Sequence, residues 1–184
     1  MRFKVEVVLK LKFPNKSNQS GGSMSETIDI TGDASQDDEN VNSEKYLVFT
    51  ILDRLYSFPS RHIGEIALYD TVYPLPLMPS YVLGVINRYS VPYALFDIGL
   101  LLYKNPCPRK KMLVMKDNID RIAFLIDDVN GIADIRQETL LNIERNPESD
   151  DITEAVSASF NWNDSDVLVL DIPRILARVS QEAV

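Results

Sequence analysis

The stretch KYLVFTILDRLYSFPSRHIGEIALYDTVYPLPLMPSYVLGVINRYSVPYALFD, residues 45–97, decides the fold of this 184-residue chain. Its apolar side chains come in short runs rich in β-branched and aromatic residues, and turn residues separate the runs. Such a pattern leaves little room for long helices. We therefore predict strands, of which the first two form a hairpin: 46–52, 55–58, 62–68, 82–87 and 91–97.

The same texture continues toward the C-terminus. We expect strands at 111–116, at 121–135 with a bend near Asp127 and Asp128, and at 167–170. Prolines at 74, 76 and 79 make the segment before residue 82 a crossover rather than a ladder strand. The regular spacing of short strands indicates an all-β barrel or sandwich.

Helical periodicity is clear only near the C-terminus. Apolar residues recur there at i, i+3, i+4 and i+7, at Ile172, Ile175, Leu176 and Val179. Asp171 stands at the N-cap, and a proline follows in the first turn, where its missing N–H costs little. We predict a short amphipathic helix there, and a turn or two of helix at 137–143.

Charge divides the chain into unequal parts. The net charge of −8 disfavours nucleic acid as a partner. Residues 1–23 carry five basic groups and one acid, whereas residues 24–45 carry seven acids and one lysine. We therefore divide the chain into a basic leader (1–23), an acidic disordered linker (24–44), a folded domain (45–178) and a tail (179–184).

The leader has three open interpretations. Its alternating segment 2–13 is typical of a strand, so it could be an extra edge strand. It could also be an upstream extension if Met24 is the true start, or an expression appendage. The chain has no apolar run long enough to cross a bilayer and no signal-peptide pattern, so we expect a cytoplasmic protein without membrane insertion.

Reactive groups are scarce. The single histidine, His62, and the single cysteine, Cys107, lack the partners that a metal site or a nucleophile needs, and no glycine-rich phosphate loop exists. Asp127 and Asp128 should point to opposite faces of a strand, one solvated and one capping a turn. We predict no cofactor, no metal and no enzyme; a hydrolase using Asp127 and Glu65 is a minor alternative.

Several motifs in order resemble one family. Residues 49–56 fit an F-x-L strand, a turn and a tyrosine, and IGEI at 63–66 fits a V-x-E-I element. After the proline crossover, GVINRYS at 84–90 is similar to a G-V-x-N-x-R-G turn. IAFLIDDV at 122–129 and VLVLDIPRIL at 167–176 match two later elements. Together these motifs resemble the CheW coupling proteins of bacterial chemotaxis.

The resemblance implies a mainly β fold of two packed five-stranded SH3-like β-barrel subdomains with a short C-terminal helix. It also implies a non-enzymatic adaptor, located at receptor arrays, that couples the cytoplasmic hairpin tip of chemoreceptors to the regulatory domain of a CheA-type histidine kinase. The receptor-binding residues that it implies are Ile63, Glu65, Gly84, Asn87, Arg88, Tyr89 and Val129.

One departure bears on that site. Tyr89 stands where the family has arginine, Arg88 precedes it, and Ser90 replaces the family glycine. Because a shift of one position in a strand sends a side chain to the other face, Arg88 substitutes for the family arginine only if the turn is remodelled. The alternative function is therefore a CheW-like adaptor for another sensory output, such as surface motility or development.

Overall fold

The computed structural model describes residues 42–68, 71–108, 111–116, 120–144 and 152–182. Its elements are, in chain order, β1 Ser43–Ile51, β2 Arg54–Pro59, the 3-10 helix η1 Ser60–His62, β3 Ile63–Leu68, β4 Val82–Arg88, β5 Val91–Asp97, α2 Ile98–Tyr103, β6 Lys111–Met115, β7 Ile122–Ile126, β8 Asp128–Arg136, η2 Gln137–Thr139, β9 Leu141–Asn142, η3 Ile152–Ala155, β10 Val156–Trp162, β11 Ser165–Leu170 and α3 Ile172–Glu182.

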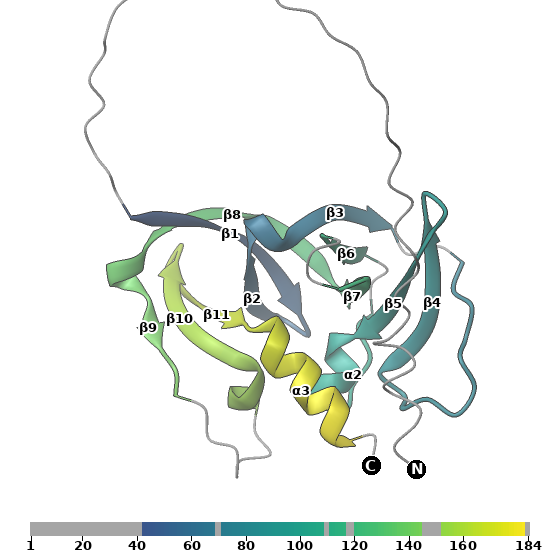
Figure 1. Ribbon diagram of the computed structural model, residues 1–184. Coiled ribbons are helices and arrows are strands. Elements are labelled where there is room, and N and C mark those ends of the chain that lie inside the picture. Colours follow the sequence, from purple (N-terminus) through teal and green to yellow (C-terminus); the bar gives the residue numbers. More distant parts are fainter. Residues whose placement is uncertain (1–41, 69–70, 109–110, 117–119, 145–151, 183–184) are drawn as a thin grey trace, which may run out of the picture.

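These strands form two sheets (Figure 1). One has six strands in the order β8-β1-β2-β11-β10-β9, and the other has five in the order β3-β6-β7-β5-β4. Most neighbours are antiparallel, but β11 pairs with β2 and β5 with β7 in parallel. The prediction of a mainly β fold with two SH3-like subdomains and a C-terminal helix is confirmed; the two-residue β9 adds a sixth strand to the first sheet.

Three hairpins turn on two residues each, and all six turn residues have positive φ. Such turns match the right-handed twist of the flanking strands. Asparagine and aspartate tolerate this conformation best among non-glycine residues, so the leucine, tyrosine and serine are unusual here. The residues are Leu52 and Asp53 between β1 and β2, Tyr89 and Ser90 between β4 and β5, and Asn163 and Asp164 between β10 and β11.

The two sheets share one hydrophobic core. Phe49 and Phe58 of the first sheet stack with centroids 5.4 Å apart, and Phe58 stacks on Phe124 of the second sheet at the same spacing. The ring of Phe96 is tilted against that of Phe124, with the two ring centroids 6.1 Å apart. Burial of each such ring contributes roughly 1.5–3 kcal/mol, so this chain of rings fastens the subdomains together.

The C-terminal helix was predicted from its period and is confirmed as α3. Asp171 caps it, because its Oδ1 accepts a hydrogen bond from the backbone N–H of Arg174 at 3.0 Å. Ile175 and Val179 are buried in the shared core. Arg174 also donates from its guanidinium to the carbonyl oxygen of Val156, which ties the helix to β10. In Figure 1, α3 lies between the two groups of strands.

The predictions for the bend at Asp127, for the segment 137–143 and for the remaining elements had mixed outcomes. The break between β7 and β8 at Asp127 confirms the predicted bend. The helix predicted at 137–143 is confirmed only in its first part: η2 forms one turn of 3-10 helix, and β9 follows it. Neither α2 nor β10 was predicted.

The proposed domain limits meet the described residues only in part. The basic leader 1–23 and residues 24–41 of the acidic linker lie outside the described residues. β1 begins at Ser43, two residues before the predicted domain start, and α3 runs through Glu182, past the predicted end at 178. None of the helices in the described part of the chain has the length and apolar character that a membrane crossing requires.

Candidate protein-binding site

An ion pair joins the two edges of the second sheet. β3 and β4 stand at opposite ends of the strand order, yet Arg88 of β4 reaches Glu65 of β3. Nη2 of Arg88 contacts one carboxylate oxygen, and Nε donates to the other at 3.3 Å. This two-point contact raises the pKa of Arg88 and fixes the geometry of both side chains. The pair therefore bridges the gap between the edge strands.

Arg88 also touches the residue that follows it. Its guanidinium carbon lies 5.2 Å from the centroid of the Tyr89 ring, a cation–π distance. Tyr89 itself is 85% exposed, because φ of +51° in the β4–β5 turn directs the chain sharply around. Arg88 thus has a carboxylate partner, and an aromatic ring stands where the family pattern has arginine; whether Arg88 replaces that arginine stays a prediction.

Gly84 acts through its backbone. Its φ is +141°, and an added Cβ would lie 2.2 Å from the carbonyl oxygen of Tyr73. Tyr73 and Val85 exchange two backbone hydrogen bonds, at 2.8 and 2.9 Å, which hold the crossover against β4. Tyr73 precedes Pro74 and is therefore biased toward extended backbone, in agreement with the crossover predicted from the prolines. The close approach explains why glycine stands here.

Asn87 lies beside the ion pair and is exposed. It lines a pocket whose other members come from the crossover, β4 and β6: Thr71, Tyr73, Ile86, Arg88 and Met112. Four of the seven predicted site residues thus form the ion pair or stand next to Arg88 in sequence: Glu65, Asn87, Arg88 and Tyr89. Gly84 also lies on β4, four residues before Arg88.

Ile63, at the start of β3, and Val129, on β8, take no part in the ion pair. Both are half-buried and pack against the shared core. Ile63 stands opposite Met115 of β6, and Val129 stands opposite Phe49 of β1. Val129 lines a different pocket, at the point where the chain passes from β7 to β8. A receptor-binding role for the seven residues stays a prediction.

Replacing Ser90 with glycine should raise the free energy of unfolding by about 0.5–1 kcal/mol, because glycine adopts positive φ without the clash that an L side chain meets. Ser90 has φ of +65° and is exposed, so no packing is lost. Urea denaturation would measure the change. Ser159→Gly in β10 is the matched control and should destabilise; a loss of stability in Ser90→Gly would contradict the turn strain.

The single cysteine and the single histidine both have shifted pKa values. Burial first, and then the charge of Asp97, raises the pKa of Cys107, whose backbone N–H donates to the Asp97 carboxylate at 3.2 Å. Burial and the neighbouring charges of Arg61 and Lys116 lower the pKa of His62. The raised pKa of Cys107 disfavours the thiolate form that a cysteine nucleophile needs.

Asp127 and Glu65, the two carboxylates considered for catalysis, and the neighbouring Asp128 have separate partners. Oδ2 of Asp127 accepts the backbone N–H of Leu52 at 2.6 Å and so caps the β1–β2 turn. Asp128 pairs with Lys111, and Glu65 is held by the ion pair described above. Among the described residues, no group of three metal-ligating side chains could hold an ion.

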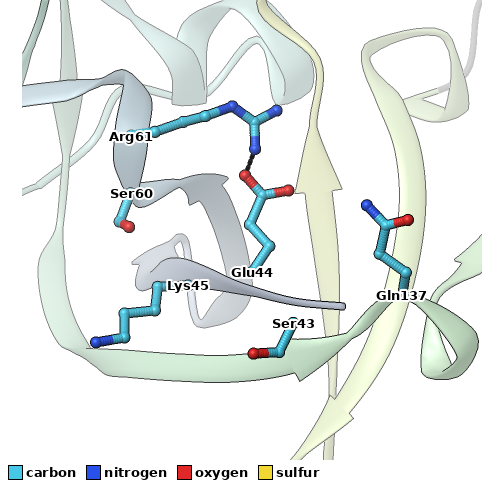
Figure 2. Close-up of a pocket in the computed structure, with 6 residues that line it drawn as sticks. All are labelled: Ser43, Glu44, Lys45, Ser60, Arg61 and Gln137. Carbon is cyan, nitrogen blue, oxygen red and sulfur yellow. Dashed lines mark ion pairs between the residues drawn. The ribbon is translucent and has the colours of Figure 1, made fainter. Parts of the chain in front are cut away.

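A further pocket, which sequence reasoning missed, opens at the start of β1. Figure 2 shows Arg61 of η1 and Glu44 of β1 pointing toward one another across it and forming an ion pair. The hydroxyl of Tyr46 donates to the same carboxylate at 3.2 Å. The remaining lining is polar and comes from Ser43, Lys45, Ser60 and Gln137. Arg61 and Glu44, the two charges that face one another in this pocket, already pair with each other, so we assign no ligand site to it.

The two sheets and their shared core define a double SH3-like domain. The family model described as CheW-like domain matches residues 45–180. The chain belongs to the CheW-like domain family.

The fold is also similar to that of a solved structure. The scaffolding protein TtCheW from Thermoanaerobacter tengcongensis has a similar fold, with a TM-score of 0.62 and 14% sequence identity over 70% of this chain and 89% of that chain. No curated protein matches this chain. At this identity the structural likeness establishes the fold alone.

Proposed function

We propose that this protein is a non-enzymatic adaptor that couples chemoreceptors to a CheA-type histidine kinase in the cytoplasm. The match of a CheW-like domain over residues 45–180 carries the proposal. The inert environment of Cys107 and the structural partners of the candidate carboxylates support a role in binding rather than in catalysis. TtCheW, which shares the fold, is itself described as a scaffolding protein.

The proposed mechanism is linkage between two binding equilibria. An adaptor that contacts a receptor hairpin and a kinase domain at the same time passes a change in one contact to the other as a coupling free energy. The receptor side is proposed at Glu65, Arg88 and Tyr89. Their ion pair and stacking pre-order the surface, so that little side-chain entropy is lost on binding.

A binding assay with purified receptor hairpin and purified kinase regulatory domain tests this role. Reversing one charge, as Arg88→Glu or Glu65→Arg, should weaken hairpin binding about tenfold, because like charges then separate the edges of β3 and β4. Kinase binding should change less. The double reversal restores an opposite-charge pair and should recover part of the loss.

The outcomes separate two failures. If the unaltered protein binds no kinase of this family, the adaptor role is wrong. If it binds the kinase but both single reversals leave hairpin affinity unchanged, only the placement of the receptor site is wrong. Arg136→Glu, at an exposed position of β8, changes the net charge by the same amount as Arg88→Glu and is its control.

The exposed ring of Tyr89 favours a second candidate, an adaptor for another sensory output. A tyrosine offers stacking and one hydroxyl where a guanidinium offers five donors, so it selects a different partner surface. Tyr89→Arg should raise affinity for chemoreceptor hairpins if the first candidate holds. An unchanged affinity would favour the second.

A further inference from the structure

An acidic pocket lies where the chain passes from the second sheet to the first. Its walls come from both subdomains: the end of β1 and the β1–β2 turn on one side, the loop before β6 on another, and the β7–β8 junction. The lining residues are Thr50, Asp53, Pro108, Asp127, Asp128, Val129 and Asn130.

Asp127, one of the lining residues, has a carboxylate oxygen without a hydrogen-bond partner. Asp127 is only 7% exposed, and its Oδ2 accepts the N–H of Leu52. Its Oδ1 is buried without a hydrogen bond. A buried acceptor on a charged group that makes no hydrogen bond is unfavourable, so a donor from a partner would relieve that penalty.

The charge of the pocket is negative. Lys111 pairs with Asp128, but among the described residues no basic side chain forms an ion pair with Asp53 or Asp127. Asp53 is exposed at the rim. The charge balance therefore favours a cation, and the described residues offer no set of ligands for a metal ion.

We propose that this pocket receives an arginine side chain from a protein partner. The guanidinium would donate to Oδ1 of Asp127 and to Asp53 at the rim, because its five donors point in several directions within one plane. Its aliphatic stem would lie on Val129 and Pro108, the apolar members of the lining. The inference rests on the proposed function only in taking the protein to act by binding other proteins.

The direct test needs no partner. Backbone amide resonances of the full chain are followed by NMR while Nα-acetyl-arginine methylamide is added, with the lysine and citrulline derivatives as matched probes. We expect saturable shifts at Leu52, Val129 and Asn130 with the arginine probe, weaker shifts with lysine, and none with citrulline, which keeps the shape but lacks the charge. Equal shifts with citrulline, or none with arginine, overturn the proposal.

Asp127→Asn is the decisive variant. It keeps one oxygen for the N–H of Leu52 and replaces the other oxygen by an NH2 donor, so the turn cap remains while the site for arginine is lost. Affinity for the arginine probe should fall about tenfold or more. Asp134→Asn, an exposed acid on β8, removes the same charge and should bind the probe normally.

Two further sets of variants test the pocket independently of Asp127→Asn. Asn130→Lys places a cation at the exposed rim without touching the core and should abolish probe binding even if Asp127→Asn folds poorly. Shifts that arise only after Arg109 and Lys110 are changed to glutamine would mean that the chain fills the pocket itself, and would overturn the proposal. A protein that binds the arginine probe but neither kinase nor hairpin would refute the proposed function and leave the pocket standing.

Discussion

Alanine at position 84 is expected to lower the free energy of unfolding by about 3–5 kcal/mol, because backbone strain and overpacking add at one site. The new Cβ would lie 2.2 Å from the Tyr73 carbonyl oxygen and 2.9 Å from Cα of Pro74, and backbone atoms cannot move aside as a flexible side chain can. The φ of +141° adds strain for any L side chain. Thermal or urea unfolding measures the loss.

The matched control for this change is Gly64→Ala on β3. An added Cβ there would lie 3.3 Å from the carbonyl oxygen of Val114, 3.4 Å from that of Met115 and 3.5 Å from the backbone N of Lys116, and no positive φ is involved. We expect a change below about 1 kcal/mol, since glycine in a strand is itself unfavourable. Equal costs for Gly64→Ala and Gly84→Ala would contradict the close approach of the crossover to β4. The structural need for Gly84 does not depend on whether a receptor binds nearby.

Local patterns predicted much of this fold. The β1–β2 hairpin, the β4–β5 pair and the bend between β7 and β8 follow from short apolar runs with turn residues between them. α3 follows from its period and from Asp171 at the cap. These elements share one property: the residues that determine each of them are adjacent in sequence.

The elements that escaped prediction lack such a local signal. α2 is only six residues long and is buried on most sides, so its sequence IGLLLY has no helical period and reads as an extension of β5. Its cap, Asp97, which accepts from the N–H of Leu100, looks like the end of a strand. β10 begins VSAS, where small and polar residues hide the alternation.

The candidate site shows the same limit. The resemblance could name Glu65 and Arg88 separately, but their contact joins opposite edges of a sheet across 23 positions of sequence. Whether Arg88 could reach a partner depended on the turn at Tyr89 and Ser90. Both residues have positive φ, and this could not be predicted because neither is a glycine or asparagine, the residues typical of such turns. The orphan oxygen of Asp127 is likewise a property of packing, because only the folded chain buries it.

Phe58→Ala is expected to cost about 3–5 kcal/mol of stability and to weaken both subdomains together. Phe58 is fully buried between Phe49 of its own sheet and Phe124 of the other, with both centroids at 5.4 Å. Removing the ring leaves a cavity at the junction rather than inside one sheet. Because one core serves both sheets, a loss of packing there should lower the stability of each by the same amount.

Two probes can follow the subdomains separately. Fluorescence of Trp162, the only tryptophan of the chain, reports on the first sheet, and amide exchange of β7 reports on the second. In Phe58→Ala both should shift equally. Phe160→Ala, which opens a cavity in the separate cluster around Tyr46, is the matched control. If the sheets unfold as one unit, the stability lost in Phe160→Ala should also appear as faster amide exchange in β7. If amide exchange in β7 is unchanged in both variants, the two sheets have independent cores. The shared ring stack would then not couple them.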